Sequence, residues 1–509
     1  MTSIKYLSLT KGQRLLVNIG GFFKGIGKGI VNFFKRIPFK FIKLGHKIAK
    51  PFSVLHDAWK KGTWMVRGNF LVFGLYQLFH NQIMRGILYL MYEVVFIWFM
   101  IKLGVPYLAK LGSLGTFSPT SMYVADAYQG LTVTIPGDRS FTILLYSIVT
   151  FILIGIFVVL WYYSIRDARS LQNSYAVGKY EKNGQFFKDI LDKNYHTLLL
   201  AVPLVGLVGF TVIPVIFMVI TGFTNYSGTQ FYLFDWVGFD NYSNLFSGMS
   251  AASSSGGTGL VTIFLKVLAW TLMWALIATF TNYFLGMVVA LLINKKGIKL
   301  KKLWRTVLIL TIAVPQFVSL LLISQMFSGS GFLTKVFENI GWIAHDTLPF
   351  DNVLLSRIII VVVNMWVGVP YTMLICSGLL MNIPEDLYES ARIDGATPFK
   401  MFSAITLPYM LFITGPYLLS QFVGNINNFN IIYLLSQGKP SFGLSSLGYG
   451  DVGQTDLLIT WIYKMSMEGQ DKNYAVACVL GVLVFIIIAF FSLIFYGRSN
   501  SVKNEGDFQ

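Results

Sequence analysis

The sequence lacks most of the groups that an enzyme active site needs. Only 12% of its 509 residues are charged, and it has two cysteines and five histidines. The histidines, at positions 46, 56, 80, 196 and 345, lie outside the apolar runs or at their edges, and no His/Cys spacing typical of a metal site is present. There is also no nucleophile elbow and no GxxxxGK[ST] phosphate loop. The sequence therefore predicts a chain that catalyses no covalent reaction and binds no metal or ATP by that loop.

The cysteines are too few, and too apolar in their surroundings, to form a disulfide framework. Cys376 and Cys478 both lie within apolar runs. We expect each to be a small buried hydrophobic residue.

What the sequence has in excess is apolar surface. Hydrophobic residues make up 55% of the chain and aromatic residues 16%. A run of about 20 apolar residues is long enough to span a bilayer as a helix. The sequence therefore predicts an all-α polytopic membrane protein with about eight transmembrane helices, at residues 83–104, 141–163, 197–222, 262–294, 303–327, 355–380, 408–436 and 473–496.

The net charge of +17 is unevenly distributed, which predicts the orientation in the membrane. Residues 164–196 and 295–305 carry six Lys or Arg each, whereas residues 223–261 carry none. Because cytoplasmic loops carry the positive charge, the two basic loops and both termini are expected to face the cytoplasm. This placement favours a membrane protein over one that binds nucleic acid.

Two segments outside the spans have a distinct composition. Residues 1–67 contain a basic stretch with apolar residues at helical spacing, which is typical of a helix lying on an anionic membrane surface, although a disordered basic tail has a similar composition. The Ser/Gly-rich residues 247–259 are expected to form a flexible external loop. Residues 498–509 are expected to be a cytoplasmic tail.

Glu93 is the one carboxylate clearly inside a predicted span. An ionisable residue there is costly and often functional, but a lone carboxylate is a weak basis for a proton relay. We expect Glu93 to have a structural, hydrogen-bonding role. This argues against an ion-coupled secondary carrier, which would need carboxylates inside the membrane.

Uncharged amides recur in three spans. Gln421, Asn425 and Asn428 stand at i, i+4 and i+7 in the seventh span, so they are expected to share one helical face. Asn364 and Gly368 stand four apart in the sixth, and Gln316 follows Pro315 in the fifth. Amides donate and accept hydrogen bonds, which suits an uncharged polyhydroxyl ligand. Joining helices to one another is an equally open role for them.

The segment "YESARIDGATPFKMFSAITLP" (388–408) is polar and yet lies between the sixth and seventh spans. It resembles the EAA motif of ABC-transporter permease subunits, with Glu389, Ser390, Ala391 and Gly395 followed by a segment that ends at Pro408. The one departure is Ser390, where the family usually has alanine. The resemblance implies that residues 382–408 form a cytoplasmic coupling loop that docks on a separate ATPase subunit.

Further stretches resemble the MalF-type subunits of maltose and maltodextrin importers: "WVGFDNYSNLF" (236–246), "LYESARIDGA" and "GQTDLLITWIYKMSMEG" (453–469). The resemblance covers roughly residues 200–500 and implies an ABC type I importer fold. It assigns sugar contacts to Asn364, Gly368, Gln421, Asn425 and Asn428, with Gln316 as a further candidate. The chain departs from the family at Gln421, at Ile312, where a tyrosine is expected, and at "SQGKP" (436–440).

The resemblance also implies partners. It predicts a second permease subunit, two ATPase subunits that bind ATP and Mg, an extracellular solute-binding protein and an oligosaccharide substrate, in the cytoplasmic membrane of a bacterium.

The domains expected are residues 1–67, residues 68–196 with the first two spans, and a core of six spans at residues 197–497. A permease for another oligosaccharide or for glycerol phosphate stays an alternative, although a phosphorylated substrate would favour Arg or Lys in the pathway.

Overall fold

The computed structural model describes residues 51–116, 122–125, 132–135, 137–179, 188, 191–192, 195–251, 260–295, 297–443, 451–468 and 472–498. The stretch 1–50, and with it most of the expected surface helix, lies outside these residues, as does nearly all of the tail 498–509. Both described cysteines are free, with Cys376 buried and Cys478 half-buried, as expected for small apolar side chains.

The chain divides into two compact units. Unit 1 comprises Met1–Ala109 and Leu145–Thr211, and unit 2 comprises Lys110–Leu144 and Val212–Gln509. The long helix α7 (Ser140–Ala176) runs through the boundary. Residues 51–61 of unit 1 are helical too. Further helices of this unit are α3 (Trp64–Gly68), α4 (Leu75–Phe79), α5 (Ile83–Phe99), η1 (Met100–Gly104), α6 (Val105–Lys110), α9 (Tyr195–Leu207) and η3 (Val208–Val212).

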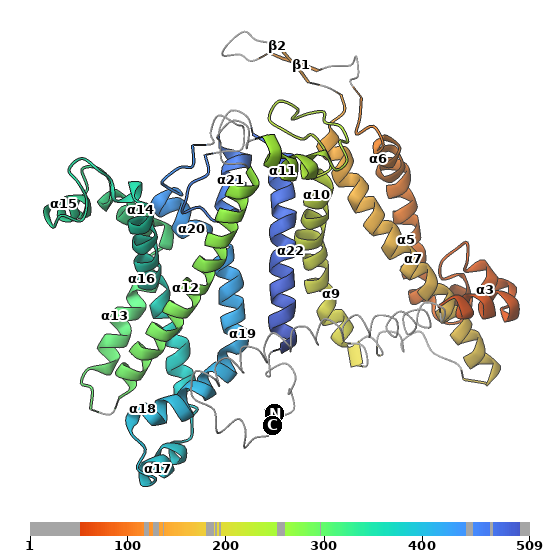
Figure 1. The fold of residues 1–509 in the computed structure, drawn as a ribbon. Coiled ribbons are helices and arrows are strands. Elements are labelled where there is room, and N and C mark those ends of the chain that lie inside the picture. The colour runs from red at the N-terminus through yellow and green to blue at the C-terminus, as the bar shows by residue number, and fades with distance from the viewer. Residues whose placement is uncertain are drawn as a thin grey trace, which may run out of the picture. The chain divides into compact units, whose positions relative to one another are not determined.

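Unit 2 holds the rest of the secondary structure (Figure 1). Its helices before the polar segment are α10 (Ile213–Thr221), α11 (Asp240–Ala251), α12 (Leu260–Asn294), α13 (Lys301–Ala313), α14 (Gln316–Met326), α15 (Phe332–Asn339), η5 (Pro349–Asp351) and α16 (Val353–Leu380). Those that follow are α17 (Glu385–Ile393), α18 (Pro398–Met401), η6 (Phe402–Thr406), α19 (Leu407–Ile426), α20 (Phe429–Ile431), η7 (Ile432–Ser436), α21 (Leu458–Met467) and α22 (Tyr474–Arg498).

The predicted spans are confirmed. Seven of the helices that the structure describes are long and apolar enough to cross a membrane, and α13 with α14 makes an eighth if this bent pair counts as one span. Each of the eight overlaps one predicted span. The Pro315 that interrupts the fifth predicted span lies at the bend of 86° between α13 and α14.

Two local expectations are wrong. A short antiparallel hairpin of β1 (Met122–Ala125) and β2 (Thr132–Ile135), with Met122 opposite Ile135, lies between the first two spans, where no strand was expected. The expected flexible loop at 247–259 also begins too early, because residues up to Ala251 belong to helix α11. Residues 252–259 lie outside the part that the structure describes.

Glu93 has the structural role expected for it. Its side chain is buried in unit 1, and its Oε2 accepts a hydrogen bond of 2.8 Å from the backbone N–H of Phe73. This contact ties the segment before α4 to the first span. A buried carboxylate that accepts such a bond is one way in which a polar group inside a membrane protein is satisfied.

The core of unit 2 is a close crossing of α12 with α16. An ideal Cβ added to Gly286 would lie 2.6 Å from Cβ of Thr372, and one added to Gly368 would lie 2.1 Å from Nδ2 of Asn282. Small residues let transmembrane helices approach closely, and close approach maximises dispersion contacts where lipid gives no hydrophobic driving force. Between these two positions of α12, Tyr283 forms a buried hydroxyl pair with Thr414 of α19 at 2.7 Å.

A buried ion pair joins the described residues that precede and follow residues 444–450. Nζ of Lys464 on α21 donates to Asp456 Oδ2 at 2.7 Å, to the carbonyl of Gln437 at 2.6 Å and to that of Asp451 at 3.0 Å. Asp456 in turn accepts from the N–H of Gly453 at 2.7 Å and from Thr460 at 2.8 Å. Every ammonium proton therefore has a partner.

We expect Lys464→Met to lower the free energy of unfolding by about 3–5 kcal/mol, because it leaves the Asp456 carboxylate buried without its cation. Thermal unfolding of the purified chain in detergent measures this. The double variant Asp456→Ala/Lys464→Met should lose less than the sum of the two single variants, and Lys335→Met, at an exposed position of α15, should lose almost nothing. Additive losses would show that the two charges do not stabilise one another.

Candidate functional site

A break in a membrane-spanning helix borders one hollow of unit 2. Val314 and Pro315 have extended backbone, with ψ of 125° and 126°. Proline has no N–H to continue the helix, and it disfavours helical geometry in the residue before it. Irregular backbone at membrane depth occurs where it is covered by protein or lines a cavity, so the break marks a place for a ligand.

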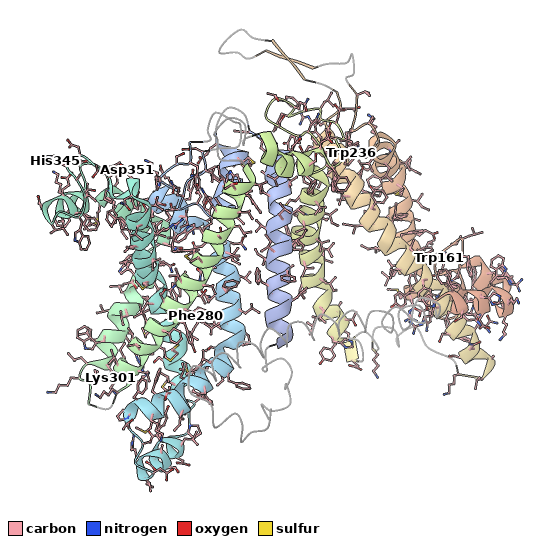
Figure 2. All side chains as sticks on the ribbon, viewed as in Figure 1. Trp161, Trp236, Phe280, Lys301, His345 and Asp351 are labelled. Carbon is pink, nitrogen blue, oxygen red and sulfur yellow. The ribbon has the colours of Figure 1, made fainter. Side chains whose placement is uncertain are left out.

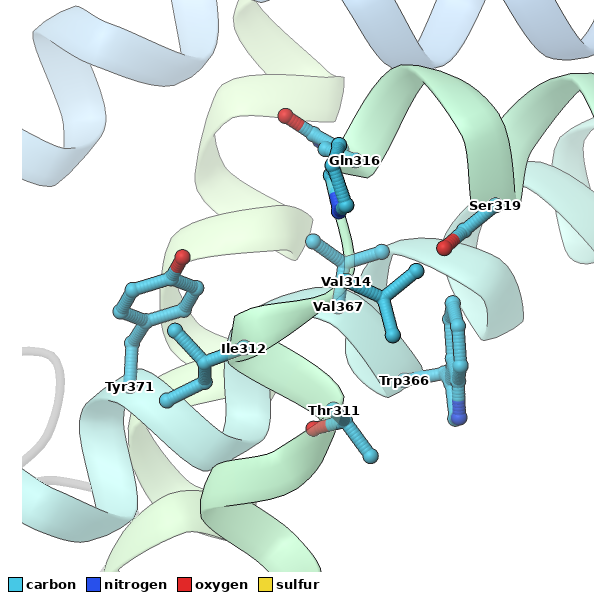
Figure 3. Close-up of a pocket in the computed structure, with 9 residues that line it drawn as sticks. Thr311, Ile312, Val314, Gln316, Ser319, Trp366, Val367 and Tyr371 are labelled. Atoms are coloured by element: carbon cyan, nitrogen blue, oxygen red, sulfur yellow. The ribbon is translucent and has the colours of Figure 1, made fainter.

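A cavity of about 210 Å³ lies against this break (Figure 3). It is lined by α13 and α14 on both sides of the break and by one stretch of α16, through Thr311, Ile312, Val314, Pro315, Gln316, Ser319, Trp366, Val367 and Tyr371. None of these side chains carries a charge. The lining thus combines amide and hydroxyl groups with two aromatic rings.

The aromatic rings are the part of this site that sequence reasoning missed. Trp366 is 46% exposed and Tyr371 49% exposed, so both rings are available to a ligand. Figure 3 shows Tyr371 beside Ile312, and Trp366 on the opposite side of the view, below Ser319. They supply aromatic surface although Ile312 occupies the position where a tyrosine was expected. Their place in the stretch "NMWVGVPY" (364–371) was the available signal.

Of the six predicted contact residues, Gln316 alone lines this cavity. Its Oε1 accepts a hydrogen bond of 3.5 Å from Nδ2 of Asn430, the exposed second residue of α20. Asn430 was not among the predicted residues. The contact brings the segment after α19 to the rim of the helix break.

Asn364 and Gly368 both lie on α16, within two residues of Trp366. Asn364 is buried, and its Nδ2 has no hydrogen-bond partner among the described residues. Gly368 faces Asn282 of α12, whose Oδ1 is also buried without a described partner. Gly368 therefore has a packing role in this structure. The two unsatisfied amide groups near it belong to Asn364, one turn earlier on α16, and to Asn282 on α12.

The expected common face of Gln421, Asn425 and Asn428 is only partly present. Helix α19 ends at Ile426, so Asn428 lies beyond it, where its Oδ1 caps α20 by accepting from the N–H of Ile431 at 3.4 Å. Gln421 is exposed. Asn425 is buried, and its Nδ2 donates to Thr279 Oγ1 of α12 at 3.0 Å.

The polar segment 382–408 forms a second candidate site, for a protein partner. Helix α17 ends in a Schellman motif, in which Ala396 N–H donates to Ala391 O at 2.8 Å and Gly395 N–H to Arg392 O at 3.0 Å. Gly395 has φ of +75°, a left-handed conformation that favours glycine. The turn expected after this helix is therefore present at Gly395.

The middle of the segment, residues 384–400, is largely exposed, whereas Ile383 and Thr406 near its ends are buried. The hydroxyl of Tyr388 lies 2.8 Å from Thr406 Oγ1 and so joins α17 to η6, which precedes Pro408. Glu389 and Ser390 are exposed and Ala391 is half-buried. Ile393 is 87% exposed and Phe399 78% exposed. Apolar side chains this exposed, beside acidic ones, are typical of a surface that docks on another protein.

The spans, the broken helix and the exposed helical segment define a transport permease. Residues 282–500 match the family described as "Binding-protein-dependent transport system inner membrane component". The chain is 32% identical over 450 residues to the maltodextrin transport system permease protein MdxF of Bacillus subtilis (strain 168), an alignment that covers 85% of this chain and 94% of that protein. The chain belongs to this family of membrane permeases.

Two further similarities concern a second sugar permease and a chain of a solved transporter structure. The galactooligosaccharides transport system permease protein GanP of Bacillus subtilis (strain 168) is 30% identical over 85% of this chain and 96% of its own length. Among solved structures, a chain of a bacterial alginate ABC transporter, in complex with an alginate pentasaccharide-bound periplasmic protein, aligns over 62% of this chain with 20% identity and a TM-score of 0.48.

We expect Gly368→Ala to destabilise the chain by about 1–3 kcal/mol, because the new methyl group would overlap the Asn282 amide and force α12 and α16 apart. Thermal unfolding in detergent measures the loss. Gly424→Ala on α19 is the matched control, because its methyl group would meet no atom within 4 Å, and it should be neutral or slightly stabilising. Equal stability of the two variants would contradict the close crossing.

Proposed function

We propose that this chain is one of the two permease subunits of an ATP-driven oligosaccharide importer, with maltodextrins as substrate. The observation that carries the proposal is the 32% identity to a maltodextrin permease along nearly the whole of both chains. The chain itself binds and gates, and it performs no covalent reaction. Hydrolysis of ATP belongs to separate ATPase subunits, which hold the ATP and Mg.

The cavity at the helix break suits a neutral sugar. Its lining has no charged side chain, which disfavours a phosphorylated substrate. Trp366 and Tyr371 offer half-exposed rings for sugar faces, and Gln316 and Ser319 offer hydrogen bonds to hydroxyl groups. We propose that the unsatisfied amide of Asn364, the rim residue Asn430, and Gln421, Asn425 and Asn428 extend this site along the pathway.

We propose that the chain lies in the cytoplasmic membrane of a bacterium with both termini in the cytoplasm. Lys301, the first residue of α13, lies at the same end of unit 2 as α17 and α18, whereas His345 and Asp351 lie at the opposite end (Figures 1 and 2). Positive charge marks the cytoplasmic end of a permease. This orientation places Glu389 and its exposed apolar neighbours where a cytoplasmic ATPase can reach them.

Transport then follows alternating access. A solute-binding protein delivers the sugar from outside to this chain and a second permease subunit. Closure of two ATPase subunits on ATP moves α17, and the rigid contact of Tyr388 with Thr406 passes this movement to the helix that begins at η6. Because α19 continues from η6, a movement at the docking surface reaches Gln421 and Asn425.

A second substrate class has support of its own. The 30% identity to a galactooligosaccharide permease covers 85% of the chain as well, so galactooligosaccharides are the competing substrate class. An ion-coupled carrier has no such support, because Glu93 is held by the Phe73 N–H.

A pair of variants tests whether Asn425 contacts the sugar or only joins α19 to α12. We expect Asn425→Ala and Thr279→Val to lower the melting temperature by similar amounts, since both remove one hydrogen bond worth about 0.5–1.5 kcal/mol. Only Asn425→Ala should reduce ATP-dependent uptake of maltodextrin into proteoliposomes that hold the complete transporter, with galactooligosaccharide as the competing sugar. If uptake falls equally in the two variants, Asn425 only joins α19 to α12.

Coupling is tested at Gly395. Gly395→Pro should abolish sugar-stimulated ATP hydrolysis in the assembled transporter, because proline cannot adopt φ of +75° and loses the N–H that bonds to Arg392. Gly395→Asn is the control, since asparagine tolerates this conformation and keeps the N–H. Membrane insertion, followed by yield and melting temperature, should be unchanged in both. Normal coupling in the proline variant would remove the docking assignment.

A further inference from the structure

A second cavity in unit 2 has a different chemistry from the first. It measures about 280 Å³ and lies between α12, α16 and the residues Phe442 and Gln454. Its lining includes the cations Lys266 and Arg357, the rings of Trp270 and Phe442, the thioether of Met273 and Gln454. None of these residues belongs to the site at the helix break.

Arg357 is fixed in this cavity with part of its hydrogen-bonding capacity unused. Its guanidinium carbon lies 4.2 Å from the centroid of the Trp270 ring, a cation–π distance, and its Nη2 donates to the carbonyl of Gln454 at 3.0 Å. Its Nε is buried and has no partner among the described residues. A guanidinium presents a fork of donors that matches the oxygen atoms of a phosphate or carboxylate.

Lys266 places a second positive charge on the same cavity. Its Nζ lies 5.9 Å from the centroid of the Phe442 ring, and its side chain is otherwise exposed. In the part of the chain that the structure describes, neither Lys266 nor Arg357 forms an ion pair. Two uncompensated charges on membrane-spanning helices are costly, and such residues usually serve a binding function.

The depth of the two cations suits the headgroup region of a bilayer. Each lies in the second turn of its helix, Lys266 after the start of α12 at Leu260 and Arg357 after the start of α16 at Val353. The face of α12 that continues from Lys266 away from this end is exposed and apolar, through Met273 (49%), Leu276 (46%) and Phe280 (44%). Phe280 is labelled in Figure 2, about midway along α12.

We propose that this cavity binds an anionic phospholipid, with the phosphate between Lys266 and Arg357 and an acyl chain along the exposed face of α12. Two cations beside an apolar strip match one charged headgroup joined to one hydrocarbon chain. A soluble anion would use the cations and leave the strip unused. The phosphodiester charge would lie between the two cations and fix α12 against α16 at the end away from α17.

The full-length chain, purified in a neutral detergent, tests the proposal by native mass spectrometry during titration with dioleoyl phosphatidylglycerol or dioleoyl phosphatidylcholine. We expect the wild type to bind phosphatidylglycerol at least tenfold more tightly than phosphatidylcholine. Lys266→Gln and Arg357→Gln should each reduce this preference threefold or more. Lys335→Gln, which removes an exposed charge of α15 outside the cavity, should leave it unchanged.

Three results would overturn the proposal. An unchanged preference in both Lys266→Gln and Arg357→Gln would place lipid binding elsewhere. Displacement of the lipid by millimolar inorganic phosphate would define a site for free anions. Loss of the second permease subunit when Lys266→Gln is purified as the assembled transporter, with lipid binding of the chain intact, would assign the cations to a protein interface. Lys266 is exposed, so its variant stays informative if Arg357→Gln unfolds.

Discussion

The permease core depends on the distance between two helix backbones, those of α12 and α16. Lipid does not drive helices together as water does, so the crossing is stabilised by dispersion contacts that require Gly286 and Gly368 to lack side chains. The residues on both sides of the helix break line the first cavity together with α16. Helix α19 is joined to α12 by the contacts of Tyr283 with Thr414 and of Asn425 with Thr279. Both candidate ligand surfaces of α16 take their positions from that crossing.

Helical backbone is interrupted at Pro315 and at Gly395, and each interruption forms a different candidate binding surface. At Pro315 the chain turns by 86° within the apolar layer and opens a cavity beside uncharged polar groups. At Gly395 it turns at the end of the bundle, where the Schellman motif satisfies the last carbonyls of α17 and leaves its apolar side chains exposed. One interruption serves a small ligand and the other a protein surface, and both follow from single residues with unusual backbone preferences.

The features that could be predicted from the sequence are those set by local chemistry. Apolar runs predicted the spans because length and hydrophobicity alone decide whether a helix can cross a bilayer. Gly395 predicted a turn because left-handed backbone favours glycine. The position of Asn428 was not predicted, because helical spacing assumed that the helix continued, whereas α19 ends at Ile426 and Asn428 caps α20. Likewise, Gly368 looked like a ligand contact, but its neighbour Asn282 lies 86 residues away in sequence (368 − 282).

The ion pair of Asp456 and Lys464 restricts how this part of the chain can evolve. Each charge is buried and satisfied by the other and by backbone groups that flank residues 444–450. A lineage that replaces one charge alone must pass through a state with an unpaired buried ion, while replacement of both at once avoids it. Residues 444–450 precede both charges and bear no such restriction from the pair. Substitutions and changes of length should therefore accumulate there, before two positions that themselves change only together.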